Sequence, residues 1–125
     1  SAVSWLNQYT YSNMKVGYCR VWAPCIIVTQ GANTSLVLDK LASTYPLDDM
    51  SIEGSRPWRA EIKLMNSALW RLPMTSGRKL VLAHELAHAS GLWKHTAAGG
   101  SLMSVPIHRS RFRLNAYQRS VLARN

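Results

Sequence analysis

The clearest periodic pattern in the chain covers residues 58–65, where apolar and charged side chains alternate. A period of two is typical of a β-strand that buries one face and exposes the other. The expected buried face holds Ala60, Ile62 and Leu64, and the opposite face holds Arg59, Glu61 and Lys63. We therefore predict a half-buried strand over this range.

The first quarter of the chain predicts a helix followed by extended structure. Trp5, Leu6 and Tyr9 have helical spacing, which predicts a short helix or an ordered arm within residues 1–13. Residues 15–30 are rich in β-branched and aromatic side chains and are interrupted by an Ala-Pro pair. This composition predicts two strands or one bent strand.

The middle of the chain predicts a helix and then a loop. Asn33 or Thr34 can cap a helix over residues 36–43, which the Tyr-Pro pair that follows would close. Residues 47–56 then hold three of the six acids, including Glu53. Because their spacing matches no calcium motif, we expect a solvated loop there.

Two further helices are expected in the second half. After a connector over residues 67–74, a hydroxyl side chain can cap a helix that runs from about residue 76 to about residue 90. Asn115, with Gln118 three residues later, predicts a capping box at the start of the last helix. Val121 and Leu122 of that helix would pack on the domain.

Composition adds limits on size and partners. A chain of 125 residues with 47% hydrophobic content predicts one globular domain with its own core. Its net charge of +9 should attract anions such as acidic polypeptides, nucleic acid or anionic envelope polymers, although no motif indicates nucleic acid. No apolar run approaches the roughly 18 residues of a membrane span, and the N-terminus lacks the pattern of a signal peptide. We expect a monomer without a membrane span.

The two cysteines leave two alternatives open. Cys19 and Cys25 flank a proline that favours a bend, so a short-loop disulfide is one of them. The other is a pair of buried thiols in a reducing compartment. An extended chain over this interval would hold the sulfur atoms too far apart for a bond, so the choice depends on the bend.

The strongest chemical pattern is a set of three histidines. His84 and His88 stand four residues apart, so on a helix both imidazoles project from one face and can bind one metal ion. Glu85 stands beside them, where it can take a proton from a metal-bound water. Gly91 permits the left-handed turn that would end the helix and bring His95 back to the metal. Three neutral imidazoles and a water complete a tetrahedral catalytic site for Zn²⁺.

Written as H-E-x-x-H-x-x-G-x-x-H, this pattern resembles the signature of the metzincin metallopeptidases. Three histidines at this spacing disfavour a buried helix whose histidines only hydrogen-bond. A purely structural zinc site is also disfavoured, because such sites usually close with four protein ligands. Downstream, the Gly-Gly-Ser-Leu-Met run of residues 99–103 looks like the methionine turn of the family, with Met103 as the floor under the metal.

Within the metzincins, residues 80–122 are most similar to the matrixins, the matrix metalloproteinase type. The spacing from His95 through Met103 to a short wall segment is similar, although a histidine replaces the family's wall tyrosine. The resemblance implies a substrate pocket that accepts an apolar side chain. Its wall would consist of Pro106, Ile107 and His108, and its primed side would lie near Leu80 and Val81.

The resemblance also implies an α+β, metzincin-like fold, with a twisted mixed β-sheet, a long active-site helix, the methionine turn and a C-terminal helix. A single minimal catalytic domain would divide into a sheet-containing upper part (1–79), the active-site helix (80–91) and a lower part (92–125). The strand predicted at residues 58–65 precedes the metal helix, so we expect it to be the edge strand that pairs with a substrate backbone. An edge blunted by charge is the alternative.

The function implied is that of a zinc-dependent endopeptidase. Zinc would lower the pKa of its bound water from about 15.7 to about 7, and Glu85 would pass the proton to the leaving amine. The substrate would be a polypeptide, acidic or held on an anionic scaffold, and the family resemblance favours a secreted or cell-envelope location. One alternative is a basic zinc-binding structural or interaction module of a virion, secretion apparatus or envelope, which has no chemical need for Glu85. The other is a nucleic-acid-associated peptidase or an injected toxin domain.

Overall fold

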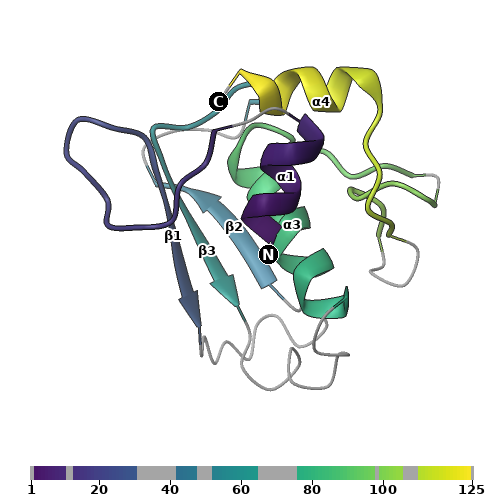
Figure 1. Ribbon diagram of the computed structural model, residues 1–125, viewed down its shortest axis with the longest axis horizontal. Helices are drawn as coiled ribbons and strands as arrows, with labels where there is room; N and C mark the ends of the chain where they lie inside the picture. The colour runs from purple at the N-terminus through teal and green to yellow at the C-terminus, as the bar shows by residue number, and fades with distance from the viewer. Residues whose placement is uncertain are drawn as a thin grey trace.

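The computed structural model describes residues 2–10, 13–30, 42–47, 52–64, 76–97, 99–105 and 110–124, which form a small α+β fold (Figure 1). The helices and strands of these residues are, in chain order, α1 (Ala2–Thr10), β1 (Cys25–Gln30), β2 (Ala42–Pro46), β3 (Arg59–Leu64), α3 (Ser76–Ala89) and α4 (Ala116–Ala123). None of these helices is long and apolar enough to cross a membrane.

The three strands form a mixed sheet in the order β1-β3-β2. β1 runs parallel to β3, with Cys25 opposite Arg59, and β2 runs antiparallel to β3. Ala60 and Ile62 on one face of β3 are buried, as the alternating pattern predicted. The expected edge position of the 58–65 strand is wrong, because β3 is paired on both sides. Alternating charges report which face of a strand meets solvent, but not whether its backbone edges are paired.

The helices lie on one side of this sheet (Figure 1). α3 contacts β2, β3 and α1, and α1 also contacts α4. Burial of a large apolar side chain stabilises a fold by about 1.5–3 kcal/mol, so the apolar core between these elements holds them together. The core consists of Ala2, Leu6, Ala60, Ile62, Ala83, Leu86, Ala87, Ala89, Leu92, Leu102, Met103, Leu114, Val121 and Leu122.

The predicted N-terminal helix is confirmed as α1. Leu6 is fully buried on its inner face. Trp5 stacks on Tyr9 with ring centroids 4.9 Å apart, and it meets Phe112 edge-on at 5.0 Å. The Tyr9 hydroxyl lies 3.3 Å from both the backbone nitrogen and the carbonyl oxygen of Leu114. These contacts attach the first helix to the C-terminal segment.

The prediction of strand over residues 15–30 is correct only for Cys25–Gln30. Residues 15–24 are irregular, because proline lacks the N–H that a strand ladder needs and a disulfide closes the bend. That disulfide joins Cys19 to Cys25, whose Cα atoms are 5.6 Å apart. Of the two alternatives that the sequence left open, the structure therefore has the short-loop disulfide and not the pair of buried thiols.

The predicted helix over residues 36–43 is wrong at its C-terminal end. Ala42 and Ser43 belong to β2, and the rest of the range lies outside the described residues, as does the predicted connector 67–74. Ala42 is buried where β2 pairs with β3. Pairing with a strand distant in sequence overrides the local helix propensity of this run.

The predicted capping box is confirmed at the start of α4. The Asn115 side chain accepts a hydrogen bond from the backbone N–H of Gln118 at 2.8 Å, and the Gln118 side chain accepts one from the N–H of Asn115 at 2.9 Å. Val121 and Leu122 are buried, as expected. Helix α4 lies against α1.

Candidate metal centre

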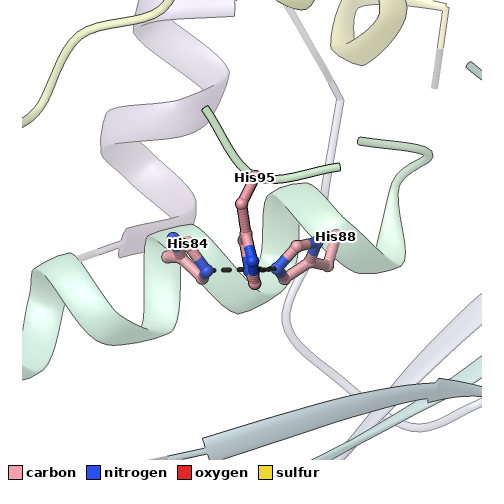
Figure 2. Close-up of side chains that lie close together, drawn as sticks. All are labelled: His84, His88 and His95. Atoms are coloured by element: carbon pink, nitrogen blue, oxygen red, sulfur yellow. Dashed lines mark hydrogen bonds between the residues drawn. The ribbon is translucent and has the colours of Figure 1, made fainter. Parts of the chain in front are cut away.

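Helix α3 carries the first two histidines on one face. His84 and His88 are four residues apart, and both rings are buried together with Glu85. The rings of His84 and His88 lie nearly perpendicular, with centroids 4.6 Å apart (Figure 2). The alanine and leucine residues around them favour a helix and face the sheet and α1. A helix fixed by its core contacts therefore presents both imidazoles at the same place.

The helix ends in a turn that requires glycine. Gly91 has φ +117°, and the last turn is closed by hydrogen bonds from Gly91 N to His88 O and from Leu92 N to Ala87 O, each 3.0 Å. This pair of bonds is the Schellman arrangement, in which glycine takes the left-handed position and an apolar residue follows. Leu92 is buried accordingly. The chain can then return toward the helix and carry His95 with it.

Three ring nitrogens converge as a result. His88 Nε2 lies 3.1 Å from His84 Nε2 and 3.0 Å from His95 Nε2 (Figure 2). One nitrogen from each of the three rings lies within 4.8 Å of the other two. A tetrahedral zinc with Zn–N bonds of about 2.0–2.1 Å needs ligand nitrogens roughly 3.3 Å apart. The three side chains are thus spaced as ligands of one small cation.

The opposite ring nitrogens determine which tautomer is present. His84 Nδ1 lies 2.7 Å from the carbonyl oxygen of Leu102, and His88 Nδ1 lies 2.6 Å from that of Leu92. A carbonyl oxygen only accepts, so each Nδ1 carries the proton and each neutral ring offers a lone pair at Nε2. Lone pairs facing one another at about 3 Å repel unless a cation lies among them. This donor set fits zinc, and the carbonyls fix the orientation of the two rings, as outer-shell partners do in metal sites.

Burial also favours the neutral form of the His84 ring. Desolvation lowers the pKa of His84 below its ordinary value, and the hydrogen bond to the Leu102 carbonyl opposes part of that shift. A lowered pKa keeps the imidazole neutral at neutral pH, which is the form that binds a metal.

The catalytic candidate Glu85 meets the sheet as well as the helix. The Thr44 hydroxyl on β2 donates a hydrogen bond to Glu85 Oε2. A carboxylate can accept several hydrogen bonds, so this contact fixes the side chain and leaves it able to accept a further proton. The sequence pattern did not identify Thr44, since nothing in a lone threonine indicates which strand edge it will occupy.

A second residue that the sequence did not identify holds the turn before His95. Glu53 Oε2 accepts hydrogen bonds from the backbone N–H groups of Trp93, at 2.7 Å, and Lys94, at 3.3 Å. In the same loop, Gly54 N donates to Gly91 O at 2.8 Å, while Trp93 Nε1 donates to Ser55 O at 3.2 Å. As predicted for the 47–56 loop, residues 52–56 form neither helix nor strand. Glu53, however, accepts hydrogen bonds from backbone N–H groups and is not bound to water alone.

The predicted methionine turn is hydrogen-bonded to His84 and to the residue after His95. Met103 is fully buried, and its carbonyl accepts a hydrogen bond of 2.9 Å from the N–H of Thr96, the residue after His95. The neighbouring Leu102 carbonyl accepts from His84 and, at 2.8 Å, from the Ser110 hydroxyl. This backbone therefore links the second-half loop to the His84 imidazole and to the backbone next to His95.

The predicted substrate pocket is only partly within the described residues. Val81 is buried and Leu80 packs against the core, so both have a structural role in α3. The wall residues Pro106, Ile107 and His108 lie outside the described ranges. The pocket stays a prediction.

The centre consequently brings together three convergent imidazoles, a buried glutamate and two positioning groups, Thr44 and Glu53. No protein-family model, curated protein or solved structure matches this chain, so the interpretation of the centre rests on its own residues and geometry.

Proposed function

We propose that this chain is a zinc-dependent endopeptidase of the metzincin type. The observation that carries the proposal is the convergence of the Nε2 atoms of His84, His88 and His95 beside the buried Glu85. Histidines that only stabilised a helix would have no reason to fix both Nδ1 protons on carbonyls and turn their acceptor nitrogens toward one another.

In this function each side chain has one task. His84, His88 and His95 would hold the ion through Nε2. When bound, zinc polarises a substrate carbonyl and makes water acidic enough to ionise near neutral pH. Glu85 would accept the proton of the attacking water at its carboxylate and deliver it to the leaving amine nitrogen. Thr44 would hold Glu85 Oε2, so that the carboxylate keeps one orientation through both proton transfers.

The sheet supports one position for the substrate peptide. Among the described strands β2 pairs with β3 alone, and we place an extended substrate peptide on its other backbone edge. Thr44 lies in this strand and reaches Glu85. A peptide added to β2 would thus run beside the proposed general base, so β2 and not the predicted strand 58–65 would pair with the substrate.

The finer features of the fold belong to the same proposal. A metzincin-like domain would use α3 as its active-site helix, residues 99–103 as the methionine turn and α4 as the C-terminal helix. The buried Met103, the Gly91 turn and the position of α4 after the turn support this assignment. The pocket formed by Leu80, Val81, Pro106, Ile107 and His108 would then select an apolar side chain.

The test combines metal analysis with a peptide-library cleavage assay. We expect wild type to bind one zinc per chain and to cleave the library. Glu85→Gln should keep the zinc and lose cleavage, whereas His88→Ala should lose both. Glu61→Gln on β3, an acid that lies beside Lys63 and is distant in sequence from the histidines, is the control and should behave as wild type.

The results separate the proposal from its alternatives. Stoichiometric zinc without any Glu85-dependent cleavage would contradict the peptidase and favour the basic zinc-binding module. Absence of zinc binding would contradict both. Cleavage accompanied by DNA binding with a steep salt dependence would favour the nucleic-acid-associated peptidase.

A further inference from the structure

Residues 13–24, hereafter the exposed arm, place large apolar side chains in water. The exposed fractions are 88% for Val16, 100% for Tyr18, 86% for Val21 and 72% for Trp22. Single exposed apolar residues are common on protein surfaces and need no explanation. Four within seven positions of one segment are a concentrated apolar surface, which is typical of an interaction site.

The arm is attached at both ends: Met14 packs partly buried against the core and exchanges hydrogen bonds of 2.8 and 2.9 Å with the Asn7 side chain, while the far end is bonded to the sheet. The Cys19–Cys25 disulfide closes it onto β1, and Cys25 N donates to Trp58 O at 3.0 Å. Arg59 Nη2 on β3 donates to Arg20 O at 2.6 Å. In Figure 1 the arm is the dark purple loop that starts near α1 and extends past the β1 side of the sheet. The arm can therefore present its apolar groups without a core of its own.

The charge of this region has a single sign. No aspartate or glutamate occurs in residues 1–38, and the arm carries the cations Lys15 and Arg20. The Arg20 guanidinium carbon lies 5.7 Å from the centre of the Trp22 ring, so charge and aromatic surface are presented together. With a net charge of +9 on the whole chain, the partner should be anionic.

We propose that the exposed arm docks on the surface of an anionic lipid bilayer. Trp and Tyr prefer the interface between headgroups and acyl chains, and Lys and Arg beside them pair with anionic headgroups. Side chains on a loop that are 72–100% exposed suit a soft medium that closes around them, whereas a protein partner would need a surface matched to their shape. Docking of this kind lies on the membrane and does not cross it.

The proposal is independent of the peptidase function, because none of its residues belongs to the metal centre. The proposal also agrees with the presence of the disulfide. Disulfides persist in oxidising environments, and the outer surfaces of membranes face such environments. Docking through the arm would hold the chain at a surface and leave the metal centre to act there.

The first experiment is co-sedimentation of the full chain with vesicles. We expect binding to vesicles of phosphatidylcholine and phosphatidylglycerol in equal parts, little binding to pure phosphatidylcholine, and weaker binding as salt is raised. Tyr18→Ala/Trp22→Ala should lower the affinity by at least about tenfold, and Lys15→Gln/Arg20→Gln should remove most of the preference for phosphatidylglycerol.

Matched controls lie outside the arm. Tyr45→Ala/Tyr117→Ala removes two other exposed aromatic residues, and Arg119→Gln/Arg124→Gln removes two exposed cations, one in α4 and one at its C-cap. Both should bind vesicles as wild type does. Circular dichroism and urea unfolding confirm that every variant is folded, so a loss of docking cannot be a loss of structure.

A second readout locates the contact. Vesicles that contain brominated lipid should quench the tryptophan fluorescence of wild type, and the quenched component should disappear in Trp22→Phe, which retains an aromatic ring for docking. Equal binding to both vesicle types, or equal loss in arm and control variants, would overturn the proposal. So would arm-dependent binding to soluble polyglutamate, or arm-dependent dimerisation, without binding to vesicles.

Discussion

The Glu53 carboxylate accepts a 2.7 Å hydrogen bond from the backbone N–H of Trp93, two residues before His95. The same oxygen lies 3.3 Å from the N–H of Lys94. One acidic side chain from a distant loop thus fixes the backbone that carries the third histidine. Its charge makes these bonds stronger than bonds between neutral groups would be.

We expect Glu53→Ala to weaken zinc affinity by about 10- to 100-fold, as loss of an outer-shell partner does in other metal sites. Glu53→Gln keeps an oxygen acceptor and should lose less. Competition with a chelator of known affinity measures both variants. Glu61→Ala on β3 is the control, and an equal affinity of Glu53→Ala and Glu61→Ala would contradict the positioning role.

The turn after α3 should not tolerate a side chain. Gly91 combines φ +117° with a position at which an added Cβ would lie 3.2 Å from the carbonyl carbon and oxygen of Ser55. Gly91→Ala should therefore destabilise the fold by about 1–3 kcal/mol through backbone strain, and by more through the contact with Ser55. Urea unfolding measures the loss.

Two other glycines separate strain from crowding. Gly100 has φ +93° and nothing within 4 Å of an added Cβ, so Gly100→Ala should show the strain alone. Gly17 has open space, and no left-handed φ is found there, so Gly17→Ala should be close to neutral. If Gly91→Ala were no more destabilising than Gly17→Ala, the turn would not require glycine.

The features that the sequence predicted correctly are those that depend only on residues close together in the chain. The i, i+4 spacing of His84 and His88 and the reciprocal cap of Asn115 and Gln118 depend only on helix geometry. Gly91 follows from the helix end, where one residue must be left-handed. These features need no knowledge of the rest of the chain.

The part that the sequence did not predict depends on contacts between distant residues. Thr44 reaches Glu85 only because β2 packs beside α3, and Glu53 reaches Trp93 only because the loop after β2 returns to the end of that helix. The order β1-β3-β2 likewise depends on pairing, which alternation within residues 58–65 does not report.

Thr44 should affect catalysis without affecting metal binding. Thr44→Val keeps the shape of the side chain and removes the hydroxyl that donates to Glu85, so the carboxylate loses its fixed orientation. A hydrogen bond to a charged group is worth about 1.5–3 kcal/mol, and we expect kcat for peptide cleavage to fall on the order of tenfold or more. Zinc content should stay at the wild-type value.

Rescue by serine distinguishes this role from packing. Thr44→Ser restores the donor and loses a methyl group, so it should recover most of the activity. If valine were active and serine were not, the threonine would act through its methyl group and the hydrogen bond would have no catalytic role. Ser43→Ala in the same strand is the control.

The stability of the zinc-free protein should depend on pH through His84. Burial lowers the pKa of this residue below its ordinary value of 6.5, despite the hydrogen bond to Leu102. The unfolded chain therefore takes up a proton before the folded chain does as the pH falls. The contribution of the neutral ring to stability is present above about pH 6.5 and is lost as the pH falls through the folded pKa.

Urea unfolding of chelator-treated protein between about pH 7.5 and about pH 5 should show this decline in the free energy of unfolding. His84→Asn replaces the ring by an amide that can still donate to the Leu102 carbonyl but does not titrate, so its profile should be flatter. His95→Asn removes an exposed histidine and should keep most of the wild-type decline. Equal slopes for wild type and His84→Asn would show that the proton is taken up elsewhere, and the neutral state of His84 would then contribute nothing to folding.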